Sequence, residues 1–423
     1  MNGDTRQTLR KVIMHIRKYN LVDRFKRSLQ NDRDFTFFIF VAISSGIASG
    51  IYNTVFSNYL NEVYHLTETQ RGFLEFPREM PGALIMVVLA LLAFMGDVRI
   101  AVLGMLAAAL GALGMGLNPG NYYLMVTVLV LFSLGTHMCM PLTPSIGMSL
   151  SSKEKYGDRL GLYSAWGLTA TLLGYAVVWG GFYFNHMSYR VAFMLASVFY
   201  MTAAVFFLFM KNRKPEKRKF RLIIRKKYTL FYLLSAANGG RKQIFLTFAP
   251  WVLITHFHLG PAQFALLGVI VSVVSILTRT IVGKAIDTYG ERLVLSFEAV
   301  LLFVICFGYI FSSRIFPPGI AVIVMCACYV IDGSMTVVEM ARSTYVKKIS
   351  TDPEEVTPTL STGVSMDHII AMSVPFLGGL LWNKTGAYQS VFVAAAVIAL
   401  INFALSMRIR IKPADLPEDS IEV

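Results

Sequence analysis

The amino-acid sequence predicts an all-α integral membrane protein of about twelve transmembrane helices in two pseudo-symmetric six-helix bundles. Three observations predict this fold class. Of the 423 residues, 55% are hydrophobic and only 15% are charged, whereas a soluble domain is about 45–50% apolar and about 25% charged. Apolar runs of membrane-spanning length recur along the whole chain. The basic residues are concentrated in alternate segments between these runs, which places them on one side of the membrane.

The apolar runs follow one another with short polar or Gly-Pro breaks, as at 118–121 and 317–319. Each contains about 20 residues, which is the length needed to cross a hydrocarbon core about 30 Å thick. The predicted spans are residues 36–60, 71–95, 100–117, 122–149, 161–183, 190–210, 228–255, 261–283, 293–313, 319–341, 359–382 and 388–407.

The net charge of +14 follows from membrane topology. With an even number of spans and a cytoplasmic N-terminus, about 31 of the 39 Lys and Arg residues fall in cytoplasmic segments and about 4 in external ones. This asymmetry is the one that the positive-inside rule requires. We therefore expect both termini to be cytoplasmic, the lipid bilayer to be the surroundings, and no nucleic-acid partner. The compact loops favour a bacterial cytoplasmic membrane.

A hydrophilic, strongly basic stretch interrupts the spans after the sixth of them. Such a linker between two sets of six spans is typical of transporters built from repeats. The predicted divisions are a basic cytoplasmic segment at 1–35, an N-terminal bundle at 36–210, the linker at 211–227, a C-terminal bundle at 228–407 and a cytoplasmic tail at 408–423.

Two loops at equivalent places in the two halves contain related motifs. Glycines allow a tight cytoplasmic turn, a carboxylate can face the positive end of a neighbouring helix, and an arginine can pair across it. The loops therefore predict tight cytoplasmic turns with paired charges. The residues concerned are Asp97 and Arg99 after the second span, and Gly283, Asp287, Gly290 and Arg292 after the eighth.

The second of these loops resembles the signature Gly-x-x-x-Asp-(Arg/Lys)-x-Gly-(Arg/Lys)-(Arg/Lys) of the major facilitator superfamily of secondary transporters. The first loop is degenerate, since Ala93 and Ile100 stand where its two glycines belong when Asp97 takes the place of the motif Asp. The resemblance covers about residues 36–407. It implies two bundles working by alternating access, with the first, fourth, seventh and tenth spans lining a central cavity. It also implies that the loop residues named above are gating residues, whose contacts control conformational change. The motifs of drug/proton antiporters and sugar porters are absent, so the subfamily stays open.

Ionisable residues inside spans are the informative ones, because each costs about 2.5–3.5 kcal/mol to place in lipid and so must face protein or water. Arg241 lies mid-span after Asn238-Gly239-Gly240, where two glycines weaken the helix. A guanidinium recognises carboxylate or phosphate in a planar, bidentate manner, and the resemblance implies that Arg241 faces the cavity. Lys242 is about 100° further round the helix and less favourably placed. The alternative for Arg241 is a structural pair with Asp332.

Asp332, in the tenth span, is a candidate for both substrate binding and proton coupling. Its protonation would release Arg241 for an anionic substrate. Asp367 and His368, in the eleventh span, are further coupling candidates, and at most one of these adjacent side chains can face the cavity fully. Histidine titrates near physiological pH. The alternative is an interhelical hydrogen bond.

The fourth and first spans supply further candidates for substrate contact. His137 stands beside Met138 and Cys139, which suggests a metal, but neighbours in a helix spread around its axis and cannot converge on one ion. We therefore predict no metal site here and treat His137 as a substrate contact or a satisfied interhelical histidine. Tyr52 and Asn53, in the first span, are polar cavity-lining candidates.

Glu75, Arg78 and Glu79 lie at i, i+3 and i+4 near the outer end of the second span, so one helix face presents all three and they can neutralise one another. Glu75 and Glu79 are proton-entry candidates, with a structural charge cluster as the alternative. No P-loop, GxSxG or HExxH motif and no cofactor box is present, so we expect neither an enzyme nor a bound cofactor.

We therefore expect a monomeric secondary transporter of a small organic solute. The charges favour an anionic solute and protons as the coupling ion. Two alternatives remain: an exporter of lipophilic or cationic compounds, in which Asp332 and Asp367 would bind the cation, and a non-transporting sensor or scaffold on the same fold. A variant Arg241→Ala is expected to lose transport while the protein still folds.

Overall fold

The computed structural model describes residues 32–118, 120–150, 156–212 and 224–410. Most of the predicted N-terminal segment, linker and C-terminal tail therefore lies outside the described residues. Helices account for nearly all of the described chain, and no strand occurs in it. Each of the twelve predicted spans overlaps a helix.

The six spans of the first half correspond to seven helices, because Leu74 separates α4 from α5 within the second span. Residues 93–95 add a 3₁₀ turn after α5. The helices are α3 (Arg33–Tyr64), α4 (Glu68–Phe73), α5 (Glu75–Leu92), α6 (Asp97–Leu117), α7 (Tyr122–Ser149), α8 (Tyr156–Tyr183) and α9 (Tyr189–Leu208).

In the second half, two predicted spans lie on either side of a non-helical turn at Gly290 within one continuous element, and one predicted span is divided. The helices are α10 (Thr229–Thr255), α11 (Pro261–Ile315), α12 (Pro318–Ser334), α13 (Glu339–Ile349), α14 (Pro353–Thr385) and α15 (Gln389–Ser406). A 3₁₀ turn at 335–338 joins α12 to α13.

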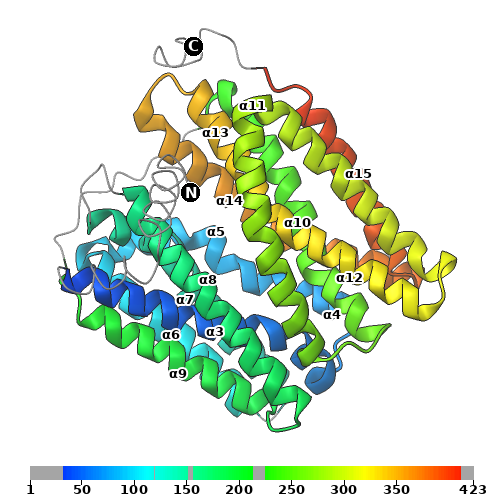
Figure 1. Cartoon of the computed structure of the whole chain (residues 1–423), viewed down its shortest axis with the longest axis horizontal. Coiled ribbons are helices and arrows are strands. Elements are labelled where there is room, and N and C mark those ends of the chain that lie inside the picture. Colours follow the sequence, from blue (N-terminus) through cyan, green and yellow to red (C-terminus); the bar gives the residue numbers. More distant parts are fainter. Residues whose placement is uncertain (1–31, 119, 151–155, 213–223, 411–423) are drawn as a thin grey trace, which may run out of the picture.

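The two halves repeat one packing pattern. In the first half, α3 packs on α8 and α9, and α6 packs on α7 and α9; in the second, α10 packs on α14 and α15, and α11 packs on α12 and α15. The contacts between the halves are also symmetric. The second span (α4 and α5) packs on the eleventh (α14), and the fifth span (α8) packs on α11, which contains the eighth. Figure 1 shows the first half, from blue to green, beside the second, which ends in red. The predicted all-α fold of two pseudo-symmetric bundles is confirmed.

Ten helical segments of the described chain are long and apolar enough to cross a membrane. One of them is α11, which is 55 residues long and contains two predicted spans. α10 is outside this set, because Asn238, Arg241, Lys242 and Gln243 interrupt its apolar sequence. A helix of this kind must bury its polar residues against protein.

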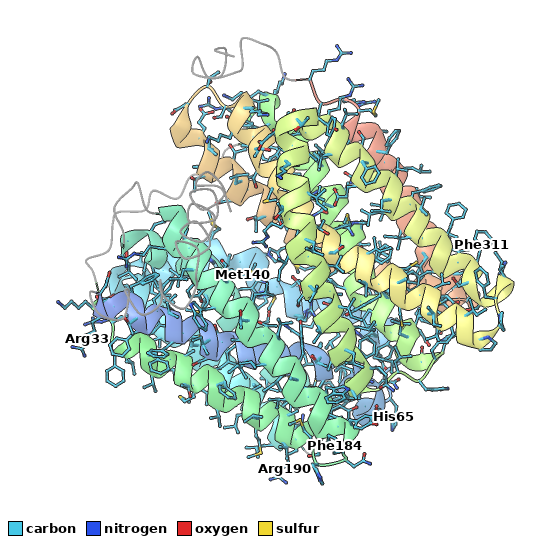
Figure 2. All side chains as sticks on the ribbon, viewed as in Figure 1. Arg33, His65, Met140, Phe184, Arg190 and Phe311 are labelled. Carbon is cyan, nitrogen blue, oxygen red and sulfur yellow. The ribbon has the colours of Figure 1, made fainter. Side chains whose placement is uncertain are left out.

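The chain reaches the two ends of the first half in turn, as it must when successive helices cross a membrane. Figure 2 shows Arg33 at one end, where α3 begins, and His65, Phe184 and Arg190 at the other end. His65 follows α3, the first span, whereas Phe184 follows α8, the fifth. The first and fifth spans therefore end on the same side.

α11 turns sharply at Gly290, whose φ of 78° and ψ of 167° are not helical. Gly96, at the start of α6, has nearly the same conformation, with φ 83° and ψ 152°. Positive φ is readily available only to glycine, so these are equivalent turns of the two halves. Gly96 therefore matches Gly290, and the expected match of Asp97 with Asp287 is wrong by four residues. The motif's second glycine is present, and Ile100 does not replace it.

Close backbone packing joins α3 to α8 at two glycines. A Cβ atom on Gly174 would lie 2.5 Å from the carbonyl oxygen of Ile47 and 3.0 Å from the Cα of Gly50. Small residues that bring helix backbones together are a principal source of stability in membrane proteins, where lipid offers no hydrophobic driving force. Gly174 is therefore required by the first bundle.

The variant Gly174→Ala should be less stable than the wild type by about 1–3 kcal/mol, since the added methyl group meets backbone that cannot move aside. The measurement is the Tm of the purified protein in detergent. Gly180→Ala, in the same helix, is the matched control, because a Cβ there has nothing within 4 Å. Equal Tm values for the two variants would contradict this account of α3 and α8.

Several contacts join the two halves at the predicted external end. Asn58 donates a hydrogen bond to the carbonyl oxygen of Leu259 at 2.8 Å, and Thr69 donates one to that of Gly379 at 3.2 Å. A Cβ on Gly379 would lie 2.5 Å from the carbonyl oxygen of Glu68. Gly72 packs equally closely against the carbonyl of Pro375. The α4 and α14 backbones are therefore in direct contact, and this end of the molecule is closed.

Candidate functional site

Glu75, at the start of α5, is fully buried and lies at the centre of a charge cluster. It accepts hydrogen bonds or ion pairs from Arg71 at 2.5 Å, from Arg78 at 2.8 Å and from the amide of Gln243 at 2.8 Å. Arg71 and Arg78 reach it because i, i+3 and i+4 positions share a helix face. Gln243 comes from α10, so this contact joins the two halves.

Glu79 lies one turn further along α5 and divides its two oxygens between two partners. Its Oε1 accepts from Arg78 at 2.9 Å. Its Oε2 lies 2.9 Å from Nδ1 of His368, which belongs to α14 in the second half, and 3.8 Å from Nε2 of His137, which belongs to α7. The predicted neutralisation within the Glu75–Arg78–Glu79 group is therefore present, and the group also contacts the second half directly.

The Gly239-Gly240 pair was expected to weaken α10, and this expectation is wrong, since the helix continues from Thr229 to Thr255. The missing side chain serves close packing instead. A Cβ on Gly239 would lie 2.6 Å from the carbonyl oxygen of Asp367 and 2.9 Å from its Oδ1. Gly239 therefore allows α14 to approach α10 at the level of the charged residues.

Arg241 is buried, with only 4% of its side chain exposed. It donates to Oδ1 of Asp332 at 2.6 Å and to Oδ1 of Asn238 at 3.2 Å, and its Nη2 lies 3.9 Å from Glu298. Arg342 is 3.3 Å from the other oxygen of Glu298. The geometry is that of the ion pair between Arg241 and Asp332 that the sequence left open as the alternative to substrate binding.

Lys242, the next residue, has a different environment. Its side chain is 30% exposed, and its Nζ lies 2.5 Å from Oδ2 of Asp367. Asn238 approaches the other Asp367 oxygen at 3.5 Å. Lys242 was expected to be less favourably placed than Arg241, yet it is the more accessible of the two cations. Adjacent helix positions differ by about 100°, which separates the two side chains.

The remaining substrate-contact candidates have varied surroundings. His137 is held through Nδ1, which lies 2.8 Å from the carbonyl oxygen of Ser133. Tyr52 is 3% exposed and stacks on Phe132 with ring centroids 3.7 Å apart, and its hydroxyl is buried without a hydrogen-bond partner. Asn53 is exposed. The structure thus brings His137 into the charged group, whereas Asn53 does not contact that group.

The gating candidates lie in or beside the two turns. Asp97 accepts a hydrogen bond from Ser145 of α7 at 2.6 Å, which fixes the start of α6 against the fourth span. Gly283 has open space where a Cβ would lie, so close packing does not require a glycine there. Arg99, Asp287 and Arg292 are exposed. Beside Gly290, the buried Glu291 pairs with Lys348 of α13 at 2.8 Å.

Three buried residues of the site were not selected from the sequence: Arg71, Gln243 and Glu298. Arg71 was placed at the outer boundary of the second span, yet its side chain is 1% exposed and its guanidinium lies 5.9 Å from the Trp251 ring. Glu298 stands alone in an apolar run, so the cost of a charge in lipid is a signal that could have found it. Gln243 has no such signal, because an amide can be exposed at little cost.

The family model of the Major Facilitator Superfamily matches residues 38–349 and, in a second match, residues 231–422. The chain belongs to this superfamily. Two overlapping matches are consistent with the repeated packing of the two halves. As a member of the Major Facilitator Superfamily, the chain is an integral membrane protein with a transporter fold. No curated protein sequence matches it.

Solved structures of superfamily transporters share the fold at low sequence identity. The nucleoside transporter NupG, in a mutant form, is 13% identical, with a TM-score of 0.72 over 88% of this chain and 99% of that one. A bacterial homolog of the human lysosomal transporter Spinster, inward-facing and occupied, is 17% identical, with a TM-score of 0.68 over 90% and 97%. A D-xylose–proton symporter is 14% identical, with a TM-score of 0.67 over 90% and 99%.

Proposed function

We propose that this superfamily member is a secondary active transporter that moves a small organic anion by alternating access and is driven by protons. The observation that supports this most directly is the position of the charged groups where the two halves meet. Glu75 and Glu79 of α5 contact Gln243 and His368 of the second half. A site made by both halves changes its geometry when the halves rock, which is what alternating access requires.

The accessible cations at this interface favour an anionic substrate. Lys242 and Arg78 have side chains that are 30% and 25% exposed, whereas Arg241 is held behind them by Asp332. A substrate carboxylate or phosphate can replace Asp367 on Lys242, and protonation of Asp332 would make Arg241 available as well. Lys242 joins Arg241, Asp332, His137 and Tyr52 in the proposed substrate site.

Proton coupling is proposed for the carboxylates and the histidine that link the halves. Glu79 and His368 form a charge-dependent contact at 2.9 Å, and protonation of either partner changes its strength. Glu75, Asp332 and Asp367 complete the proposed set. One of the similar structures is described as a proton symporter, which makes a proton-driven mechanism available to this fold.

The conformation supports a direction for the next step of the cycle. The closed end, where α4 and α14 touch, is external in the topology proposed from the positive-inside rule. The protein would then be closed to the outside and would next exchange substrate with the cytoplasm. A monomer in a bacterial cytoplasmic membrane, with both termini inside, is part of the same proposal.

The test is a thermal-shift screen of the purified protein against organic anions, sugars, nucleosides and lipophilic cations at two pH values, followed by uptake into proteoliposomes. Anions should stabilise the wild type by mass action, more strongly at the lower pH, and Lys242→Gln should lose this effect. Lys384→Gln, an exposed lysine at the end of α14, is the matched control. Stabilisation by lipophilic cations alone, unchanged in Lys242→Gln, would contradict the proposal and favour the exporter.

A further inference from the structure

Glu79, His137 and His368 form a compact group of three metal-binding side chains from three helices. Their ligand atoms all lie within 4.8 Å of one another. Oε2 of Glu79 is 2.9 Å from Nδ1 of His368 and 3.8 Å from Nε2 of His137. The two imidazole rings are perpendicular neighbours, with centroids 5.0 Å apart. Two histidines and one carboxylate are the ligand set that many zinc and iron sites use.

The hydrogen bonding of His137 leaves the correct nitrogen free for a metal. Its Nδ1 lies 2.8 Å from the carbonyl oxygen of Ser133, and a carbonyl can only accept, so Nδ1 has the proton. Nε2 therefore presents a lone pair toward Glu79, at 3.8 Å, which is too long for a hydrogen bond. In most metal sites a ligating histidine donates its other ring N–H to a carboxylate, a backbone carbonyl or water, and this bond fixes the ring in the orientation that binds the metal.

Gly82, one turn beyond Glu79 on α5, provides the space for both rings. A Cβ at this position would lie 2.6 Å from Cδ2 of His137 and 2.9 Å from Cε1 of His368. Any larger residue would push the two imidazoles away from Glu79. The glycine therefore fits a role in holding two histidines from different halves of the protein over one carboxylate.

The spacing and the charge of the group suit a divalent ion. Zinc binds nitrogen and carboxylate oxygen at about 2.0–2.2 Å, which places tetrahedral ligand atoms about 3.3 Å apart. The separations of 2.9 Å and 3.8 Å lie on either side of this value. Arg78 occupies only Oε1 of Glu79, so Oε2 faces the two histidines, and a metal ion would replace the proton between Oε2 and Nδ1 of His368.

We propose that Glu79, His137 and His368 bind a divalent transition metal of the Zn²⁺ class, with the fourth coordination position open. Glu79 and His137 belong to the first half and His368 to the second, so the bound ion links the halves in the conformation closed at the α4–α14 end. Metal binding therefore holds the transporter in this state and inhibits its cycle. The proposal shares Glu79, His137 and His368 with the proposed function, but metal binding is measured without substrate and without a proton gradient.

The test uses the full-length protein, purified without a histidine tag, and measures Zn²⁺ binding by calorimetry and by Tm. Zn²⁺ should raise the Tm of the wild type, and EDTA should reverse the effect. Mg²⁺ should have no effect at the same concentration, because it prefers oxygen ligands. An equal response to Mg²⁺ would contradict the proposal.

His137→Gln and His368→Gln should each weaken Zn²⁺ affinity by more than about 100-fold. Replacing a residue that only hydrogen-bonds to a metal ligand already costs about 10- to 100-fold. Gly82→Ala should weaken it without removing any ligand. His256→Gln is the matched control, because His256 lies at the end of α10 against Tyr388, with centroids 4.8 Å apart. A Zn²⁺ response that survives in both His137→Gln and Gly82→Ala would overturn the proposal.

If His368→Gln does not fold, His137→Gln and Gly82→Ala still test the metal site, because both variants keep Glu79 and His368. Inhibition provides a second readout: Zn²⁺ should slow uptake by the wild type, and a higher Zn²⁺ concentration should be needed to slow uptake by Gly82→Ala. The two proposals fail separately, because metal binding is measured without any substrate. Loss of Zn²⁺ binding with intact uptake, or the reverse, identifies which of them is wrong.

Discussion

Replacing Arg241 with alanine should destabilise the protein by about 3–5 kcal/mol, because it leaves the Asp332 carboxylate inside the protein without the guanidinium that lies 2.6 Å away. Glu298 still has Arg342 as a partner in this variant, so the loss of stability comes from the unpaired charge of Asp332. Protonation removes the charge of Asp332, so the loss should shrink at acidic pH. The measurement is the Tm, or the urea midpoint in detergent, at acidic and alkaline pH.

The double variant Arg241→Met with Asp332→Leu is the control. Removing both charges of a buried pair and replacing them with apolar groups of similar volume is often neutral or stabilising, so stability should return. The sequence alone predicts that Arg241→Ala loses transport and still folds. Wild-type stability in Arg241→Ala, together with lost ligand binding, would show that Arg241 is a substrate contact and not mainly a partner of Asp332.

The variant Glu79→Gln should abolish proton-driven accumulation of substrate while exchange of substrate across the membrane continues. Glutamine can still hydrogen-bond to His368, but it carries no charge and cannot take up a proton, so the contact between the halves loses the attraction between carboxylate and imidazolium. Counterflow and pH-driven uptake in proteoliposomes measure the two activities separately. The expected result is background accumulation with counterflow retained.

Glu339→Gln is the matched control for this experiment, since Glu339 is exposed in the first turn of α13. It should behave as the wild type in both assays. Accumulation by Glu79→Gln that still follows the proton gradient would rule out Glu79 as the coupling residue. Coupling would then have to be sought at Asp332 or Asp367.

The spans could be predicted from the sequence because apolar length is a local property, and each predicted span overlaps a helix. Most charged residues of the site were also found, with Arg71 and Glu298 as the omissions, because a charge in lipid is costly wherever it occurs. Their pairing could not be predicted. Glu79 and His368 are 289 positions apart, and only the packing of α5 against α14 brings them together.

Predictions from local sequence were wrong where tertiary packing determines the backbone conformation. Gly239 and Gly240 predict a weak helix by propensity, whereas α10 stays helical because the missing Cβ lets α14 approach Asp367. The loop motif was placed by its Asp residue, although the turn is set by the glycine with positive φ, Gly96 in one half and Gly290 in the other. A positive φ restricts the residue at the turn more strongly than the motif restricts the position of its Asp.

The contacts that close the α4–α14 end have a consequence for how the protein responds to ionic strength. Thr69 donates to a carbonyl of Gly379, and the glycines of the two helices pack on backbone atoms. These contacts include no charged side chain, so dissolved salt, which screens exposed charges within about 10 Å at 0.1 M, has little to act on. The closed end should therefore persist from low to high salt, and a change of ionic strength should act instead on partly exposed ion pairs elsewhere, such as Arg159 with Asp32 and Arg225 with Glu355.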